Sequence, residues 1–385
     1  MKSIGIICEY NPFHNGHRHQ IAEARKASGA DAVVCVMSGS FVQRGEVALF
    51  NKWTRAKCAL ENGADLVIEL PVWYVLQSAE MFAYGGINLL SKSRLASAIS
   101  FGTECDDIKH LVECGTILAG ENETLKEEIK SLMAKGEGYP FALRREVSAL
   151  YPHLANIIDN PNSMLGASYI SAMVKCGMPS GNIVPVKRIS APHDSDVTDG
   201  VFASSSHLRN LISDGADISH LSPFDVGSSK YYTKNLEGFI LGLLRTASPE
   251  RLACIPGIED GFENRLIDAA RKSASLEELY ERASSKRYTL SRVKRTILAA
   301  TIGMEKGKEC DYVRVLGMTD AGASLIKSVK EISELDIVTK TADFKAKANS
   351  TFTYDILATD IASLSCEDKD IRIAGRDYLI SPVKI

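Results

Sequence analysis

Short apolar runs alternate with longer helical patterns over the first half of the chain. The apolar runs are hydrophobic at consecutive positions, as in strands buried on both faces of a parallel sheet; they cover Ser3–Cys8, Ala32–Met37, Asp65–Leu70, Ala96–Phe101 and Asn182–Lys187. Helical spacing of apolar residues falls between the runs, over Asn15–Ser28, Asn51–Asn62, Gln77–Leu90 and Ser163–Cys176. This alternation predicts a doubly wound α/β domain with a parallel sheet, whose ligands bind beyond the carboxyl ends of the strands.

The pattern changes in three later regions. Residues from about 105 to 160 are helical in spacing and mix acidic and basic side chains, which predicts a helical insertion, and the small polar residues of Ser190–Ser206 predict a loop. After Phe224 the pattern is mainly helical as far as Met304. The end of the chain combines strand-like and helical segments, at Tyr312–Leu316, Ile371–Ala374 and Gly322–Ile332. We therefore predict a first domain over residues 1–219 and a separate α+β C-terminal domain over 220–385.

Composition narrows the class of protein. No apolar run approaches the roughly 18 residues of a membrane helix, and the chain enters a strand without a basic leader, so we expect a cytoplasmic protein. Nine cysteines occur without a C-x-x-C pair, which argues against a disulfide framework and against a zinc site. The eight histidines show one sequence cluster, at His14–His17. The net charge of −3 implies that any nucleic-acid contact depends on a local basic surface.

That histidine cluster is the first candidate for chemistry. Asn11 and Pro12 end the first strand, and His14-Asn15-Gly16-His17 begins the helix that follows. A helix N-terminus attracts phosphate through its free N–H groups, two imidazoles three positions apart share one helix face, and Gly16 leaves room for a base or ribose. The alternative is a pair of histidines that cap the helix through ordinary hydrogen bonds.

Several strings together resemble one family. H-x-G-H after the first strand resembles the nucleotidylyltransferase superfamily, which includes class I aminoacyl-tRNA synthetases. The longer string Gly5–His17 is similar to the bacterial tRNA(Met) cytidine acetate ligase family. Further strings match this family in order, namely Met37–Glu46, Lys52–Ala56, Ser100–Glu104, Pro161–Gly166, Ala203–Arg209 and Lys286–Thr289.

The resemblance implies a set of site residues. It assigns catalytic roles to His14, His17 and Arg209. It assigns ATP binding to the segment made of Ile7, Cys8, Glu9, Tyr10, Asn11, Pro12, Phe13, His14, Asn15, Gly16, His17, Arg18, His19 and Gln20, and to Gly102, Asn162, Arg188, Ser204 and Ser205. Without the resemblance, these last residues are open to plainer interpretations: a turn glycine, a surface arginine at a strand end and a serine N-cap.

One basic stretch is a candidate for RNA binding. From Ala283 to Thr301 the chain has no acidic residue, and Val293, Ile297 and Leu298 are spaced to face inward from a helix. The basic residues are Lys286, Arg287, Arg292, Lys294 and Arg295. Charge alone leaves two interpretations open, an RNA-binding face and a solvated face whose acidic partners lie elsewhere; the resemblance favours RNA. Gln43, Arg44, Lys52 and Arg55 follow the second strand and are candidates to bind ATP, acetate or RNA, among which the sequence does not decide. The alternative for Lys52 and Arg55 is an ordinary exposed helix face.

The resemblance predicts a ligase that activates acetate with ATP and transfers the acetyl group to N4 of the wobble cytidine of elongator tRNA(Met). Mg²⁺ is expected with ATP, and no carboxylate cluster indicates a metal held by the protein itself. The residues alone lead as far as adenylyl transfer by a nucleotidylyltransferase-like domain. Two alternatives stay open: a small-molecule nucleotidylyltransferase, and a non-catalytic RNA-binding protein with a relic nucleotide pocket.

Overall fold

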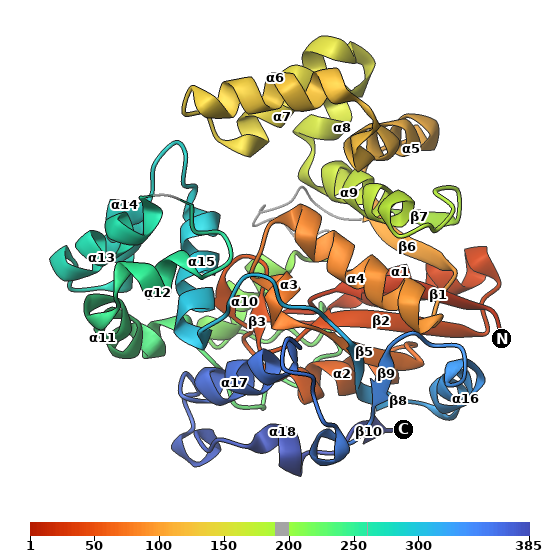
Figure 1. Cartoon of the computed structure of the whole chain (residues 1–385). Helices are drawn as coiled ribbons and strands as arrows, with labels where there is room; N and C mark the ends of the chain where they lie inside the picture. Colours follow the sequence, from red (N-terminus) through yellow and green to blue (C-terminus); the bar gives the residue numbers. More distant parts are fainter. Residues whose placement is uncertain (189–199, 260) are drawn as a thin grey trace.

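The computed structural model describes residues 1–188, 200–259 and 261–385, so most of the loop expected at Ser190–Ser206 lies outside the described residues. An eight-stranded sheet runs through this described part in the order β10-β8-β5-β2-β1-β6-β7, with β9 paired to β8 (Figure 1). Its strands are β1 (Ser3–Cys8), β2 (Ala32–Ser38), β5 (Leu66–Leu70), β6 (Ala98–Thr103), β7 (Ile183–Lys187), β8 (Tyr312–Met318), β9 (Asp336–Val338) and β10 (Val383–Lys384).

The five strands predicted in the first half are all present and pair in parallel. Strand order reverses between β1 and β6, because β2 and β5 lie on one side of β1 and β6 and β7 on the other. The α/β prediction is therefore confirmed, and the reversal marks the edge where such folds bind ligands. A short hairpin of β3 (Phe41–Val42) and β4 (Glu46–Val47) follows β2.

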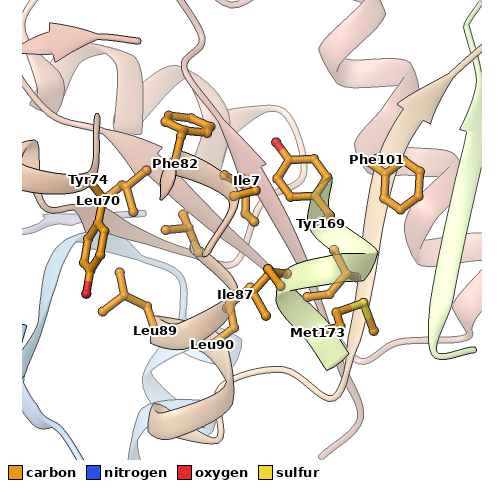
Figure 2. Close-up of a cluster of buried hydrophobic side chains, with 14 of the residues drawn as sticks. Ile7, Leu70, Tyr74, Phe82, Ile87, Leu89, Leu90, Phe101, Tyr169 and Met173 are labelled. Atoms are coloured by element: carbon orange, nitrogen blue, oxygen red, sulfur yellow. The ribbon is translucent and has the colours of Figure 1, made fainter. Parts of the chain in front are cut away.

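Helices cover both faces of the sheet. Helices α1 (Asn15–Ser28) and α2 (Lys52–Glu61) pack on one face with α10 (Ser205–Ser213). The other face carries α4 (Ala79–Ser93) and α9 (Pro161–Lys175), with the short α3 (Val72–Val75) before α4. Figure 2 shows this second layer, where Ile7 of β1 meets side chains of α4 and α9 such as Phe82, Ile87 and Tyr169.

The predicted insertion is helical. Its helices are α5 (Ile108–Thr116), α6 (Glu123–Ala134), α7 (Tyr139–Leu150) and α8 (Ala155–Asp159), with a 3₁₀ turn, η2, over Pro152–Leu154. They stack beyond α9 at the top of Figure 1. Buried side chains of the insertion, Leu125 and Val147 among them, continue the core that lies between α9 and the sheet. The insertion therefore rests on the same helix that brings Asn162 to the sheet edge.

The C-terminal part has a helical cluster and a return to the sheet. The cluster comprises α11 (Glu237–Thr246), α12 (Pro249–Ala253), α13 (Phe262–Lys272), α14 (Leu276–Ala283) and α15 (Leu290–Ile302). After α15, β8 joins the sheet antiparallel to β5, followed by α16 (Asp320–Val329), α17 (Phe352–Ser363), α18 (Arg376–Leu379) and β10. We had expected a separate C-terminal unit, but its strand β8 belongs to the same sheet as the strands of the first half. Because β8 is antiparallel to β5, the sheet is also not entirely parallel. Beyond this correction, the division into two domains near residue 220 stays a prediction.

One local prediction was wrong. Ile371–Ala374 does not form a strand; a 3₁₀ turn covers Lys369–Ile371, and the Asp368 carboxylate accepts the Asp370 N–H (3.0 Å) at its start. The last strand is β10, which pairs with β8. Within the described residues, no helix has both the length and the apolar character that a membrane span requires.

Candidate active site

A cavity of about 500 Å³ opens beyond the carboxyl ends of β1 and β6, where the strand order reverses. The segments after β1 and β2 and the end of β6 each contribute a lining residue: Glu9, Arg44 and Gly102. The starts of α1, α9 and α10 also reach the cavity. The position of the cavity follows from the topology, since parallel strands present their carboxyl ends at one edge of a sheet.

His14 and His17 cap helix α1 through reciprocal hydrogen bonds. Nδ1 of His14 accepts the Gly16 N–H (3.1 Å), and Nδ1 of His17 accepts the His14 N–H (3.2 Å). The two rings stack with their centroids 3.7 Å apart. A Cβ atom at Gly16 would lie 2.9 Å from Cε1 of His14, so the imidazole can take its capping position only because residue 16 is glycine. The capping interpretation is therefore correct for the Nδ1 atoms, and it leaves the Nε2 atoms for other partners.

Both imidazoles are neutral in this setting. Burial, with a further contribution from Arg188, lowers the pKa of His14 to about 3. Burial, His14 and Arg188 together hold the pKa of His17 well below its ordinary value. Since each Nδ1 accepts a hydrogen bond, each neutral ring carries its proton on Nε2. Both rings line the cavity and offer it N–H donors suited to phosphate oxygens without bringing a charge of their own.

The start of α10 lies against the loop that carries these histidines. Ser204 is the N-cap of α10 and accepts the His207 N–H (3.1 Å), as the plainer interpretation of this serine held. Arg209, one turn further, donates to the Asn11 carbonyl (2.8 Å) and to Ser206 Oγ (3.2 Å). Ser204, Ser205 and Arg209 all line the cavity. Two helix N-termini, those of α1 and α10, therefore face one space, which favours an anionic ligand.

Gly102, Asn162 and Arg188 form another part of the lining. Arg188 donates to Asn162 Oδ1 (3.3 Å), and Asn162 donates to the Glu104 carboxylate (2.8 Å). Burial lowers the pKa of Arg188, and the nearby Glu104 opposes that shift. The side chain of Arg188 also passes close to Gly102, where a Cβ would lie 3.3 Å from its Cγ. These residues come from β6, α9 and the end of β7, and the fold brings together three residues to which the resemblance assigned ATP binding.

The β3–β4 hairpin connects the cavity to helix α15. The Gln43 N–H donates to the Glu9 carboxylate (2.6 Å), and the Gln43 carbonyl accepts from Arg295 of α15 (3.2 Å). Burial raises the pKa of Glu9, while the Gln43 N–H and nearby arginines oppose the rise. At the hairpin turn, Gly45 has a positive φ of 79°, and a Cβ there would lie 2.6 Å from Cβ of Lys294. Gln43 and Arg44, whose roles were open, thus line the cavity.

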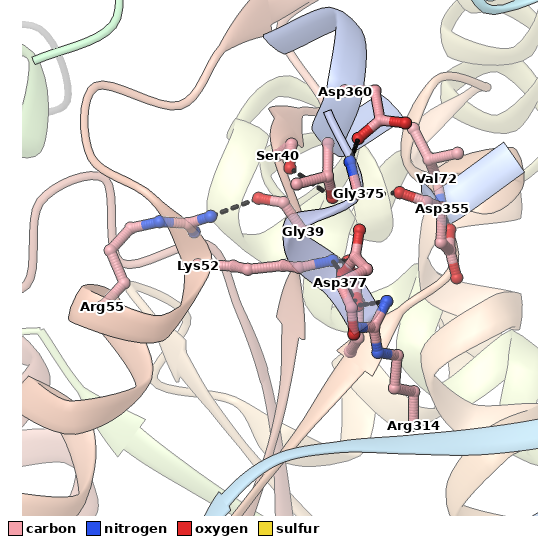
Figure 3. A network of polar contacts seen from close by, with 12 residues as sticks. Gly39, Ser40, Lys52, Arg55, Val72, Arg314, Asp355, Asp360, Gly375 and Asp377 are labelled. Atoms are coloured by element: carbon pink, nitrogen blue, oxygen red, sulfur yellow. Dashed lines mark hydrogen bonds and ion pairs between the residues drawn. The ribbon is translucent and has the colours of Figure 1, made fainter. Parts of the chain in front are cut away.

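Lys52 and Arg55, by contrast, lie inside the protein (Figure 3). Lys52 makes ion pairs with Glu69 and with Asp377 of α18, each at 2.8 Å, and Arg314 of β8 pairs with the same two carboxylates. This network holds the C-terminal segment on the sheet. Lys52 and Arg55 are therefore not available to bind RNA or acetate directly.

Arg55 connects the two loops that flank the cavity. Its guanidinium donates to the carbonyl oxygens of Phe50 (3.0 Å), Glu9 and Gly39. Glu9 follows β1 and Gly39 follows β2, so one buried side chain sets the distance between the ends of neighbouring strands. Burial lowers the pKa of Arg55 to about 10, which leaves it charged at neutral pH.

Four residues of the predicted ATP segment do not line the cavity, namely Pro12, Phe13, Asn15 and Arg18. Asn15 instead donates to the carbonyls of Val201 (3.0 Å) and His220 (2.9 Å). These two hydrogen bonds hold the segments before and after α10 against the start of α1. The sequence also missed aromatic lining residues, among them Phe82 of α4 and Tyr169 of α9. Their pattern marks them only as core, and nothing in their spacing distinguishes a core face from a cavity wall.

Helix α15 forms as predicted, with Val293, Ile297 and Leu298 fully buried. Most of the basic residues in this stretch have acidic or carbonyl partners. Glu259 pairs with Arg287 (3.2 Å) and Arg292 (2.9 Å), Lys294 pairs with Glu46 (2.9 Å), Arg295 reaches Gln43, and Lys286 is exposed. The pair of Arg287 with Glu259 is exposed on both sides, and an ion pair of this kind contributes only about 0–1 kcal/mol, so a phosphate backbone can displace it. RNA binding by this stretch stays a prediction.

Comparison with known proteins identifies the family. A model of the HIGH nucleotidyl transferase family matches residues 1–377. A tRNA(Met) cytidine acetate ligase of Caldanaerobacter subterraneus is 35% identical, over 100% of both chains. The chain belongs to the tRNA(Met) cytidine acetate ligase family. The ligase of the same name from Acetivibrio thermocellus is 34% identical and covers 98% of each chain. The resemblance seen in the sequence strings is therefore confirmed.

Solved structures of the family share the fold. The Thermotoga maritima TmcAL structure bound with alpha-thio ATP has a TM-score of 0.89 and 26% identity, over 100% of both chains. The apo structure of the same protein has a TM-score of 0.90 and 27% identity. The match extends over the full length of the chain, the C-terminal part included.

Proposed function

We propose that this protein is an ATP-dependent ligase that activates acetate as acetyladenylate and transfers the acetyl group to N4 of the wobble cytidine of elongator tRNA(Met). The observation that carries the proposal is the pair of capping histidines, whose rings line the same cavity as the N-terminus of α10 and whose Nε2 atoms take no part in the cap. Full-length relatives of this name support the choice of reaction. Acetate, Mg²⁺ and the roles of single residues are part of the proposal.

In the first step, a carboxylate oxygen of acetate attacks the α-phosphorus of ATP, and the bond to the pyrophosphate oxygen breaks. The protein contributes position and charge stabilisation to this in-line displacement. His14 and His17 donate from Nε2 to phosphate oxygens that gain charge. Ser204, Ser205 and Arg209 hold the departing pyrophosphate at the start of α10. Mg²⁺ accompanies ATP as a counter-ion of its phosphates.

In the second step, the N4 amine of cytidine attacks the acetyl carbonyl carbon, AMP leaves with the bonding electrons, and the amine loses a proton. The RNA reaches the cavity from the side of the β3–β4 hairpin, since this hairpin lies between the cavity and α15. Lys286 and Arg287, both exposed, contact the phosphate backbone there.

The test is a reaction with ATP, radiolabelled acetate and a transcript of elongator tRNA(Met), followed by nucleoside analysis. ATP-dependent label in N4-acetylcytidine is expected. Pyrophosphate release that requires another substrate in place of acetate, with no label in tRNA, would replace the proposal with a small-molecule nucleotidylyltransferase. RNA binding without any pyrophosphate release would leave only a relic nucleotide pocket.

His17→Asn separates the two roles of His17. The Asn side chain keeps an acceptor for the His14 N–H, so stability should change by less than about 1 kcal/mol. The Asn side chain is shorter than the imidazole and has no N–H group at the position of Nε2, so acetyladenylate formation should fall by about 10²-fold or more. Near-normal activity in this variant would mean that His17 only caps the helix.

The Lys286→Glu, Arg287→Glu double variant should weaken tRNA binding while pyrophosphate exchange with acetate stays intact. Lys345→Glu introduces a charge reversal at an exposed position outside the basic stretch and serves as its control. Equal tRNA affinity in the two proteins would remove RNA binding from the basic stretch.

A further inference from the structure

Two histidines and a glutamate meet on the surface of the helical insertion. His110 and Glu113 lie one helical turn apart on α5, and His153 comes from the η2 turn. Nε2 of His153 is 3.2 Å from both carboxylate oxygens of Glu113, and the rings of the two histidines are 5.2 Å apart. Donor atoms of the three side chains lie within 4.8 Å of one another. None of the three lines the cavity at the sheet edge.

Asp107, the N-cap of α5, orients one of these histidines. Its Oδ1 accepts the N–H groups of Lys109 (3.0 Å) and His110 (3.2 Å), and its Oδ2 lies 3.3 Å from Nδ1 of His110. A carboxylate on one ring nitrogen sets the tautomer and directs the other nitrogen outward, as it does for histidines that ligate metals. Asp107 thereby fixes the ring of His110, one nitrogen of which lies within 4.8 Å of ligand atoms of Glu113 and His153.

We propose that His110, Glu113 and His153 bind a divalent transition-metal ion of the zinc type, which joins α5 to the η2 turn. Two imidazoles and one carboxylate are a ligand set that Zn²⁺ accepts with a fourth position left for water. Mg²⁺ and Ca²⁺ prefer oxygen ligands and are not suited to this set. The side chains are 42–44% exposed, so an ion can enter from solvent and keep a water ligand.

Such an ion would stabilise the insertion and take no part in the chemistry. Helix α5 packs on α9, whose first turn carries Asn162, and the η2 turn packs on α5 and α8. The site corrects the sequence expectation that the histidines form no second cluster, because 43 residues separate His110 from His153 and only the packing of the insertion brings them together.

The experiment is a titration of chelator-treated full-length protein with Zn²⁺ in competition with a chromophoric chelator. We expect one tight site per chain, and at least about tenfold weaker binding in His153→Ala and in Glu113→Gln. Zn²⁺ should also raise the Tm of the wild-type protein and not that of His153→Ala. Co²⁺ in place of Zn²⁺ should show visible absorption bands that the variants lack.

His220→Ala removes an exposed histidine outside the cluster and is the matched control. Equal Zn²⁺ affinity in the wild type, His153→Ala and Glu113→Gln would overturn the proposal. The proposal would also be wrong if His220→Ala, and neither of the two cluster variants, lowered the number of Zn²⁺ ions bound per chain. An unchanged far-UV spectrum of Glu113→Gln shows that loss of binding is not loss of fold. Acetylation of tRNA should persist in these variants, so failure of the metal site and failure of the proposed ligase are separate results.

Discussion

Replacement of Arg55 by Lys tests how the protein holds its two active-site loops together. The Arg55 side chain is fully buried on α2 and donates to three carbonyl oxygens, those of Phe50, Glu9 and Gly39. Lysine keeps the charge and most of the length but has a single nitrogen. It can replace one of the three contacts at good geometry, since the guanidinium fork reaches in directions that an ammonium group cannot.

The magnitude follows from the contacts that are lost. A hydrogen bond from a charged donor contributes about 1.5–3 kcal/mol, and two of them disappear. The free energy of unfolding should therefore fall by about 3–6 kcal/mol. The Glu9 and Gly39 loops also lose their common partner, so ATP affinity should fall by about tenfold or more, equivalent to about 1.4 kcal/mol.

The assays are urea unfolding followed by tryptophan fluorescence, and titration with ATP. Lys57→Met on the same helix is the control, because Lys57 is 59% exposed and its ion pair is with Glu61, which is 50% exposed; its effect should stay within about 0.5 kcal/mol. An Arg55→Lys variant within 1 kcal/mol of the wild type in stability, with unchanged ATP affinity, would refute the reasoning.

Two further predictions concern buried groups. Burial and the nearby Glu69 raise the pKa of Asp355 from 3.8 to about 7. The contribution of Asp355 to stability is therefore present below pH 4 and is lost as the pH rises through 7. The Asp355→Asn variant can still accept the Val72 N–H, and its Tm should change less with pH over this range than that of the wild type. Gly45→Ala combines positive φ with a Cβ against Lys294, so urea unfolding should show a loss of about 2–4 kcal/mol. Gly29 also has a positive φ, but no atom lies within 4 Å of the Cβ that Gly29→Ala would add, so this control variant should lose only about 1 kcal/mol. Equal losses in the two variants would mean that the close contact between the hairpin and α15 does not contribute to the effect of Gly45→Ala.

Local patterns were sufficient for the first half of the fold. Consecutive apolar residues predicted the five parallel strands, since strands buried on both faces need no polar side. The predicted helix Asn15–Ser28 agrees with α1 at both ends, because its start is marked by capping residues and its end by Gly29. Ile371–Ala374 was misassigned because its alternation is too short to outweigh the turn that Asp368 caps.

The sequence by itself determined the class of the sheet and the position of the histidine pair at the start of the helix after the first strand, because these depend on neighbours in the chain. Only the tertiary structure decided which cations face the cavity. Arg44 lines it while Lys52 and Arg55 are buried with partners, although all three follow the same strand. The pairing of β8 with β5 was likewise undecided, since Arg314 and Glu69 are 245 residues apart and their attraction acts only once the chain has folded.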